Sequence, residues 1–552
     1  MLKIMPDILE MIKNSGKCLF VGLAGPGTGK THAFKVIIKS DEFKDKKILI
    51  LSFINKLIDD LTEDFKDFNN VEVKTLHKFA RQKFIEQFKR NVDLDKGLDD
   101  YISEDFVFIN GSDIKYDKKF YENKLTEDEL KFYENRKNFY RRKDDLHSFN
   151  SIIHTINSAF EKDELAIPEY DLVLIDEFQD FNRLEWRLIE LLNKKTKVIL
   201  VGDDDQSLYY DFRSAKPKLI RDLFDRDDTC EFTLDDCYRC TNVIVDTVNS
   251  FIANVKKNGY LKSNKIKKFN YPTQRTDDKN EVSKKYNQID FLPSVPGDRL
   301  IYQLKQRIMS DISDIEEEKE KRILVIVPSY LKQKIYDGLI KEEFNIVEYE
   351  LFSDQKRGKV KHSDIIDVFN VLIKRKTDNL ALRKILFLYL TGDETKDLII
   401  QSNKEEKKLW NCLDEDIKKE IGDDIDIFKK VKRGQDELST EDLSRLNIIF
   451  NLKKILSKTI KGFGLIKRGA IEIEVVTVMG SKGLAADFVY YVGIDNRSML
   501  DQKVNKITDQ KICEFLVGIT RAKKKLTLFS LEDKSPKILD FIDKKYINRI
   551  TL

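Results

Sequence analysis

The sequence predicts an α/β protein made of two lobes, each with a parallel β-sheet and each carrying a mostly helical insertion. Three observations lead to this fold class. Apolar runs of strand length recur along the chain and alternate with segments long enough for a helix, as in parallel sheets. These runs fall into two sets, one before residue 210 and one after residue 320. Two long, charged segments with helical periodicity interrupt the sets, at about residues 85–168 and 388–470.

Length and composition agree with several globular units. The chain has 552 residues, and at about 150 residues per domain this length predicts three or four units. Hydrophobic residues make up 41% of the chain and charged residues 35%, with only 9 prolines, which excludes a wholly disordered or fibrous protein. The net charge of +3 argues against a polycationic tail but leaves room for a local basic groove that binds nucleic acid.

Cysteine content and apolar runs predict the compartment. Six cysteines in 552 residues are too few for a disulfide scaffold, so a reducing compartment is expected. No apolar run reaches the roughly 18 residues that a membrane span needs. The N-terminus has Pro6 and Asp7 where a signal peptide would be apolar. We therefore expect a soluble, cytoplasmic protein without a membrane partner.

The expected strands follow one another in the order of the two lobes. In the first lobe the apolar runs cover residues 18–24, 47–53, 171–176 and 197–202. In the second lobe they cover residues 322–328, 473–477, 488–493 and 526–530. The expected boundaries are residues 1–84 and 169–255 for the first lobe, 85–168 for its insertion, 256–387 and 471–552 for the second lobe, and 388–470 for the second insertion.

A glycine-rich segment follows the first expected strand directly. Its sequence is Ala24-Gly25-Pro26-Gly27-Thr28-Gly29-Lys30-Thr31, a P-loop in which Ala24 stands where the common pattern has its first glycine. The glycines let successive backbone N–H groups curl around phosphate oxygens, and the following helix adds the positive end of its dipole. Lys30 is expected to reach the β- and γ-phosphates, and the Thr31 hydroxyl to bind Mg²⁺. A P-loop by itself does not distinguish an ATPase from a GTPase or a kinase.

An acidic segment ends the third expected strand. Asp176 and Glu177 open the sequence Asp-Glu-Phe-Gln-Asp directly after the apolar residues 172–175. A carboxylate at this place in P-loop proteins holds Mg²⁺, and an adjacent glutamate can polarise the attacking water. We expect Asp176 as the metal ligand and Glu177 as the general base; a solvated acidic loop is the alternative.

These two segments and several others occur in the order found in one protein family. The further segments are residues 51–56, 75–79, 201–209, 212–213, 237–240, 477–484 and 517–522. Together they resemble the sequence blocks of the UvrD/Rep-type helicases of superfamily 1, and the resemblance runs through the whole chain. It implies two RecA-like P-loop lobes with ATP and Mg²⁺ bound between them. It also implies ATP-driven movement in the 3′→5′ direction on single-stranded DNA or a tailed duplex.

The resemblance assigns roles residue by residue. Gln206 would sense the γ-phosphate, and Tyr238 would stack on the adenine. Arg239 and Arg521 would be arginine fingers, which neutralise charge that develops on the transferred phosphoryl group. DNA contacts would come from aromatic rings that stack on bases and from side chains at the DNA backbone: Phe53, Tyr209 and Phe212 as rings, and Asn55, His77 and Lys482 at the backbone.

Some positions depart from the family pattern, and other functions stay open. Residues 5–14 contain no glutamine to read adenine, Met479 stands where many members have a DNA-contacting histidine, and the second insertion is short. The main alternative is a DNA-sensing ATPase subunit that regulates a partner nuclease, for example in phage defence. A nucleic-acid-binding module without ATP hydrolysis is disfavoured because the expected catalytic residues are all in the sequence.

Two further patterns have competing interpretations. Cys237 and Cys240 have the spacing of metal ligands, but no second Cys or His pair follows at the right distance, so zinc is disfavoured. Residues 131–143 contain six basic and four aromatic residues, as in a nucleic-acid patch. The aromatic rings recur seven residues apart, however, which places them on one helix face and favours a packed core.

Overall fold

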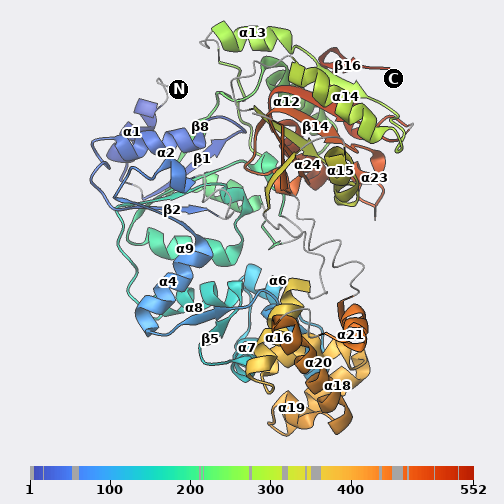
Figure 1. The fold of residues 1–552 in the computed structure, drawn as a ribbon. Coiled ribbons are helices and arrows are strands. Elements are labelled where there is room, and N and C mark those ends of the chain that lie inside the picture. Colours follow the sequence, from blue (N-terminus) through green and yellow to red (C-terminus); the bar gives the residue numbers. More distant parts are fainter. Residues whose placement is uncertain are drawn as a thin grey trace. The chain divides into compact units, whose positions relative to one another are not determined.

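The chain folds into two compact units. The computed structural model describes residues 5–16, 18–52, 61–209, 213–215, 217–272, 277–313, 321–341, 345–349, 362–433, 438–450, 464–468, 471–502, 504–532 and 534–551. Unit 1 comprises Met1–Leu76, Ala166–Glu350 and Phe463–Leu552, and unit 2 comprises His77–Leu165 and Leu351–Gly462. Unit 1 contains both large sheets, and unit 2 is mostly helical (Figure 1).

The first sheet of unit 1 has six parallel strands in the order β3-β2-β6-β7-β1-β8. They are β1 (Leu19–Ala24), β2 (Ile48–Ser52), β3 (Val71–Thr75), β6 (Leu172–Ile175), β7 (Lys197–Gly202) and β8 (Thr229–Leu234). β1, β2 and β6 are buried along their whole length, as expected for strands covered on both faces. Helices α1 (Met5–Asn14) and α2 (Lys30–Lys39) pack against one face through Ile12, Phe34 and Ile37 (Figure 1).

The second sheet has eight strands in the order β11-β12-β13-β10-β14-β15-β9-β16. They are β9 (Ile289–Leu292), β10 (Lys321–Ile326), β11 (Asn345–Tyr349), β12 (Gly464–Arg468), β13 (Ile471–Val476), β14 (Ala486–Val492), β15 (Ala522–Phe529) and β16 (Ile547–Arg549). The pairs β11/β12 and β12/β13 are antiparallel, and the other pairs are parallel.

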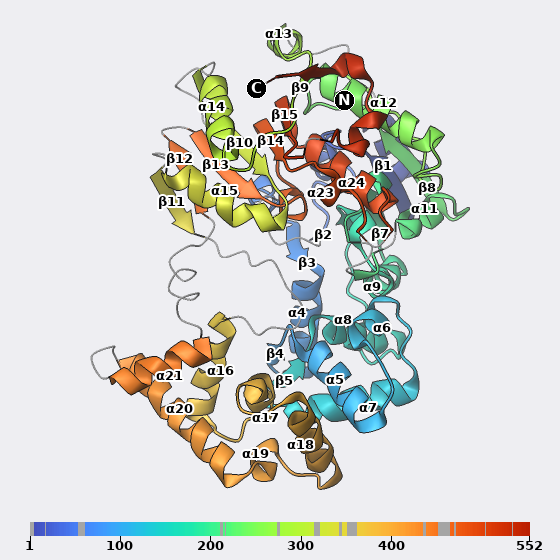
Figure 2. The same cartoon turned by 90° about the vertical axis from the view of Figure 1, so that its right-hand side faces the viewer.

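Helices cover both faces of the second sheet. Successive residues of a strand point to opposite faces of the sheet. Ile323 and Val325 of β10 therefore pack in one cluster with helices α14 and α15. Leu324 and Ile326 pack in the other cluster, with helices α12 and α24 (Figure 2). The helices of unit 1 that follow α2 are α9 (Arg183–Asn193), α11 (Lys218–Phe224), α12 (Asn242–Lys257), α13 (Asp277–Lys285), α14 (Leu300–Ser313), α15 (Ser329–Lys341), α23 (Asn496–Met499) and α24 (Asp509–Ile519). Short 3₁₀ turns are η1 (Phe178–Asp180), η2 (Asp204–Gln206), η5 (Met479–Ser481), η6 (Lys537–Phe541) and η7 (Lys544–Tyr546).

Helix α12 follows the first sheet in sequence but packs into the core of the second. Val248 and Phe251 of α12 share a buried cluster with Tyr491 and Phe515. The sequence pattern predicts residues up to 255 in the first lobe, and α12 departs from this boundary. The apolar stripe of a helix must be buried against some partner, but its periodicity does not say which sheet that partner belongs to.

Unit 2 is formed by the two insertions together. Its elements are α4 (Leu76–Phe88), β4 (Val92–Leu94), α5 (Leu98–Asn110), α6 (Tyr116–Tyr121), α7 (Glu127–Tyr140), β5 (Asp145–His147), α8 (Phe149–Glu161), α16 (His362–Lys374), α17 (Asn379–Ile385), η3 (Leu386–Leu388), α18 (Gly392–Lys404), α19 (Leu409–Cys412), α20 (Glu415–Arg433) and α21 (Thr440–Phe450). Asp105 of α5 pairs with Arg136 of α7 at 2.6 Å and with Arg383 of α17 at 3.1 Å. Helices α16 and α17 are expected in the second lobe from the sequence, but both pack within unit 2, α16 against α17 and α20.

The basic and aromatic segment 131–143 forms much of α7 and part of this core. Tyr133, Arg136 and Tyr140 are buried. The hydroxyl group of Tyr133 donates a hydrogen bond to Asp99, and the guanidinium group of Arg136 donates one to Asp105. The interpretation as a packed helix face therefore agrees with these contacts.

The predicted fold class is confirmed: the chain is an α/β protein with parallel sheets. Each of the eight expected strands is present. The structure adds six strands to the two large sheets: β3, β8, β9, β11, β12 and β16. In the part of the chain that the structure describes, no helix is both long enough and apolar enough to cross a membrane.

Candidate active site

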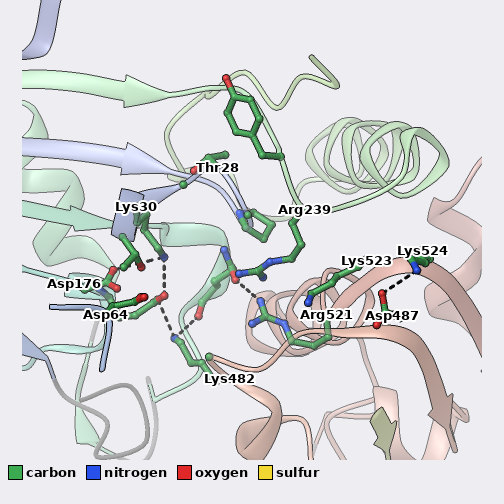
Figure 3. A pocket seen from close by; sticks show the side chains of 18 of the residues that line it. Thr28, Lys30, Asp64, Asp176, Arg239, Lys482, Asp487, Arg521, Lys523 and Lys524 are labelled. Carbon is green, nitrogen blue, oxygen red and sulfur yellow. Dashed lines mark hydrogen bonds and ion pairs between the residues drawn. The ribbon is translucent and has the colours of Figure 1, made fainter. Parts of the chain in front are cut away.

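Unit 1 contains a cavity of about 880 Å³ that the P-loop and the C-terminal sheet line together. Lys30 at the start of α2 and Asp176 directly after β6 reach it from one side, and Arg521 and Lys523 face them from the segment that begins β15 (Figure 3). Among the described residues that line the cavity, seven side chains are basic and five are acidic. A cavity of this size and charge suits a nucleoside triphosphate, whose phosphates carry most of its charge.

The P-loop owes its shape to glycines in the left-handed region. Gly27 has φ of 72° and Gly29 has φ of 88°, conformations that favour glycine. The carbonyl of Gly27 accepts the N–H of Tyr238 at 2.9 Å, and a Cβ atom on Gly27 would lie 2.3 Å from Cβ of Arg239. Gly27 thus permits both the turn and the close approach of residues 237–239. Ala24 is the last residue of β1, where the extended backbone accommodates a side chain.

Lys30 lies between two carboxylates at the end of β6. Its Nζ atom is 2.6 Å from Oε1 of Glu177 and 3.9 Å from Oδ1 of Asp176. Burial alone would lower the pKa of Lys30, but Glu177 and Asp176 raise it above its usual value. Burial alone would raise the pKa of Glu177, but Lys30 and Lys482 hold it well below its usual value. The lysine is therefore charged, and Glu177 is an ionised hydrogen-bond acceptor.

Asp176 and Thr31, the two expected ligands of Mg²⁺, both line the cavity and offer oxygen atoms, which this ion prefers. Oδ1 of Asp176 accepts the N–H of Glu177 at 2.8 Å. Burial raises the pKa of Asp176 to about 6, an effect that the Lys30 charge only partly offsets. A buried carboxyl group whose charge is incompletely balanced, in a cavity that a hydroxyl group at a helix N-terminus also lines, is compatible with a divalent cation.

Gln206 of the first lobe and Arg521 of the second lobe are joined by a hydrogen bond. Nη2 of Arg521 donates to Oε1 of Gln206 at 2.9 Å, and Nε of Arg521 donates to the carbonyl of Val517 at 2.8 Å. Burial lowers the pKa of Arg521 to about 10, and the nearby Arg239 acts in the same direction. Arg239 and Tyr238 line the same cavity, so the two arginines that the sequence separates by almost three hundred residues meet at one site.

Comparisons with known proteins agree with this geometry. An AAA domain family model matches residues 9–211. A probable DNA helicase II homolog of Mycoplasma capricolum subsp. capricolum is 25% identical over 65% of this chain and 55% of its own length. The ATP-dependent DNA helicase Rep of Buchnera aphidicola subsp. Acyrthosiphon pisum is 24% identical over 68% of this chain and 65% of its own length. A probable DNA helicase II homolog of Mycoplasma genitalium is 23% identical over 97% of this chain and 86% of its own length.

The P-loop, the acidic strand end and these relatives point to the same kind of protein. The chain is similar over most of its length to the UvrD/Rep-type helicases of superfamily 1. It spans 55% and 65% of the length of the first two relatives named above.

Lys482, which is expected at the DNA backbone, is buried in this structure. The side chain of Lys482 is only 2% exposed, and its Nζ atom is 2.5 Å from Oδ2 of Asp180. The same atom donates to the backbone carbonyl of Gln206 at 2.9 Å. The acidic end of η1 and the carbonyl of η2 thus hold the ammonium group at the cavity, and the expected contact with the DNA backbone stays a prediction. Lys482 thus joins the two lobes.

The other residues expected at DNA are placed as follows. The ring of Tyr209 lies 5.7 Å from Nζ of Lys482, close to the cavity. His77 begins unit 2, where its ring centre is 5.1 Å from that of Phe149. Phe53, Asn55 and Phe212 lie outside the described residues, so their roles stay predictions.

Sequence reasoning missed Gln179, which connects two parts of the site. Its Nε2 atom donates to Oε2 of Glu177 at 2.6 Å, and its Oε1 atom accepts the N–H of Asp203 at 2.9 Å. The feature of the sequence that could have indicated Gln179 is its position within the acidic segment 176–180. Gln179 orients Glu177 and ties β6 to the end of β7.

Cys237 and Cys240 are buried thiols in the core of the second lobe and are not part of a disulfide. Cys237 contacts the carbonyl of Pro26 at 3.4 Å, and Cys240 contacts the carbonyl of Thr520 at 3.9 Å. The two thiols hold residues 238 and 239 between the P-loop and the end of α24.

Proposed function

We propose that this protein is an ATP-dependent DNA helicase or translocase that moves 3′→5′ on single-stranded DNA. The observation that carries the proposal is the cavity in which Lys30 and Glu177 of one lobe face Arg239 and Arg521 of the other. Cations and a general base around one phosphate site suit phosphoryl transfer to water. The names of the relatives, DNA helicase II and Rep, support DNA as the partner.

Hydrolysis would begin with an exchange of partners at Lys30. The ammonium group that now bonds Glu177 would turn to the β- and γ-phosphates, which carry more charge than one carboxylate. Glu177 would then be free to accept a proton from the attacking water, while Gln179 keeps its orientation. Thr31 and Asp176 would hold Mg²⁺, which supplies charge neutralisation at the phosphates.

Coupling between lobes would use the link from Gln206 to Arg521. Arg521 donates to Gln206 across the cavity, and Lys482 donates to the backbone of the same residue. A γ-phosphate near Gln206 would therefore change contacts that hold both lobes. Tyr209 adjoins this link, and stacking of its ring on a DNA base would connect the nucleotide state to the DNA.

The ATPase experiment compares wild type with Lys30→Ala and Lys39→Ala, with and without single-stranded DNA. Lys30→Ala is expected to lower DNA-stimulated turnover at least about a hundredfold, because the triphosphate loses its lysine partner. Lys39→Ala alters an exposed residue of the same helix and should leave turnover unchanged. Near-normal turnover of Lys30→Ala would overturn the proposed site.

A strand-displacement assay tests direction and unwinding. We expect ATP-dependent separation of a duplex with a 3′ single-stranded tail, and none of a duplex with only a 5′ tail. DNA-stimulated hydrolysis without any strand separation would instead favour the alternative, an ATPase subunit that acts with a partner nuclease. Copurification of a nuclease would add to that alternative.

A further inference from the structure

A lysine ammonium group sits among three consecutive carboxylates beside the nucleotide cavity. Lys267 Nζ contacts Asp203, and it is 2.6 Å from Oδ1 of Asp204 and 3.0 Å from Oδ2 of Asp205. The lysine side chain is 9% exposed, and the three aspartates are buried. Each aspartate offers an oxygen within 4.8 Å of the others, an arrangement that repels itself unless a cation balances it. Lys267 is that cation.

The lysine is held charged in this position. Burial alone would lower the pKa of Lys267, but the three carboxylates raise it well above its usual value. Neighbouring residues fasten its segment to the same turn: Asn264 Nδ2 donates to Oδ1 of Asp205 at 2.6 Å, and the N–H of Lys265 donates to Oδ2 of Asp204 at 2.8 Å. The segment after α12 is thus docked onto η2 by its side chains and its backbone.

From Asp203, the contacts lead to Gln206 and across to the second lobe. Nε2 of Gln206 donates to Oδ2 of Asp203 at 2.6 Å, and Oε1 of Gln206 accepts from Arg521 at 2.9 Å. An ionised carboxylate only accepts hydrogen bonds and a guanidinium only donates them. The Gln206 amide therefore has a single orientation that satisfies both partners.

We propose that Lys267 is a positioning residue for ATP hydrolysis, which holds the Asp203 carboxylate in place and thereby fixes the Gln206 amide toward Arg521. The proposal rests on the proposed function. Without the lysine, the three crowded carboxylates repel one another and move apart. A displaced Asp203 carboxylate no longer accepts from Nε2 of Gln206 in the same place, so the Gln206 amide is no longer held in one orientation.

The first experiment compares Lys267→Met with Lys265→Met. Methionine keeps the length of the side chain and removes its charge. Lys265 lies in the same segment, but its ammonium group pairs with the exposed Asp225. We expect Lys267→Met to lower DNA-stimulated kcat at least about tenfold while KM for ATP and the affinity for a fluorescent ATP analogue change less than about threefold. Lys265→Met should match wild type in all three quantities.

A double-mutant cycle separates positioning from a merely structural role. In a Gln206→Ala background, the residue that Lys267 positions is absent, so Lys267→Met should lower kcat by less than about twofold further. The same tenfold loss in that background would overturn the proposal. So would a Lys267→Met variant that raises KM and leaves kcat unchanged, because the lysine would then serve the binding site as a whole.

A second variant covers the case in which Lys267→Met fails to fold. Asp203→Asn keeps the lysine with its two other partners and replaces the carboxylate that accepts from the Gln206 amide by an amide group, which can donate as well as accept. It should also lower kcat about tenfold, and this loss should vanish in the Gln206→Ala background. Wild-type kcat in Asp203→Asn would overturn the proposal. A wild-type protein that binds the ATP analogue but never hydrolyses ATP would overturn the proposed function and this proposal together, whereas unchanged kcat in Lys267→Met overturns the role of Lys267 alone.

Discussion

Glu177 is held in a backbone conformation that residues other than glycine rarely adopt, with φ of 52°. Such a conformation costs about 1–3 kcal/mol and persists where surrounding contacts determine it. Here the contacts are hydrogen bonds from Lys30 and Gln179 to the two carboxylate oxygens, each at 2.6 Å. The turn lifts the carboxylate away from β6 and into the cavity, which is the position that a general base needs.

Replacing Glu177 by glutamine tests this role, because the side chain keeps its shape and loses its charge. We expect Glu177→Gln to bind a fluorescent ATP analogue with nearly wild-type affinity and to lower turnover by about 10²–10⁴-fold. The matched control, Glu190→Gln, changes a glutamate of α9 that pairs with Arg187 at the surface and should hydrolyse ATP normally. Loss of nucleotide binding in Glu177→Gln would make the residue structural or a metal ligand.

His147 makes the stability of unit 2 depend on pH. The ring is buried against Phe84, and burial, with smaller contributions from Lys137 and Arg141, lowers the pKa of His147 to about 3. The unfolded chain takes up a proton near pH 6.5 and the folded protein does not, so stability is lost as pH falls from about 6.5 toward 3. At pH 5 this loss amounts to about 2 kcal/mol.

The variant His147→Gln should lack this part of the pH dependence. Urea unfolding at pH 7.5 and pH 5 measures it, as the difference between the wild type and the variant. Asp99 in the same unit acts with the opposite sign, since burial raises its pKa to about 6, but its contribution is common to both proteins. An equal loss of stability in both proteins between the two pH values would show that His147 is not buried in its neutral form.

At the scale of elements, helix α24 lies unusually close to β14. A Cβ atom on Gly518 would be 2.3 Å from a ring carbon of Tyr491, whose side chain is fully buried. The absence of a side chain at Gly518 therefore sets the distance between helix and sheet. Arg521 follows three residues later, so this packing also determines where the guanidinium group enters the cavity.

Two alanine substitutions in helices should have opposite effects. Gly518→Ala should destabilise the protein by about 1–3 kcal/mol because Tyr491 cannot move away without disturbing the core. Gly422→Ala in α20 meets nothing within 4 Å and should stabilise its helix by about 0.5–1 kcal/mol. Denaturant unfolding of the two variants measures both changes. A Gly518→Ala protein as stable as wild type would contradict the close packing of α24 on β14.

At the scale of the whole molecule, the chain crosses between its two units four times. Each unit is completed only by segments far apart in sequence: Asp105 and Arg383 meet in unit 2, and Lys30 and Arg521 line one cavity in unit 1. Contacts of such long sequence separation form late in folding, because chain closure has to precede them. The cavity is therefore a product of the complete chain.

Arg521 provides the test of this arrangement. Arg521→Ala should lower the DNA-stimulated rate by about 10³-fold or more while the affinity for ATP stays close to wild type, as for arginine fingers elsewhere. Arg521→Lys should restore little of the lost rate. A single ammonium group cannot reproduce the planar guanidinium group, which donates to Gln206, Val517 and Leu484. Steady-state ATPase assays at saturating DNA measure the rate. A loss below about tenfold would mean that another cation serves the γ-phosphate.

Local features of this protein could be predicted from its sequence. The eight apolar runs became strands, and Gly27 and Gly29 predicted the phosphate loop whose positive φ angles they allow. Asp176 and Glu177 were expected beside that loop because they directly follow a strand of the same sheet. Such features depend on residues only a few positions away in the chain. Strand length, backbone freedom and strand order can therefore be inferred from the local sequence.

Other features were decided only when distant segments met. The periodicity of α12 marks a buried face but not the second sheet that buries it, and nothing near Lys482 in sequence points to Asp180. In the sequence, Lys267 resembles the many surface lysines of the chain. Only the fold shows that the carboxylates of Asp203, Asp204 and Asp205 surround its ammonium group. A charge in the interior is stable only beside its partner, and the partner is chosen by the path of the whole chain rather than by the sequence around the charge.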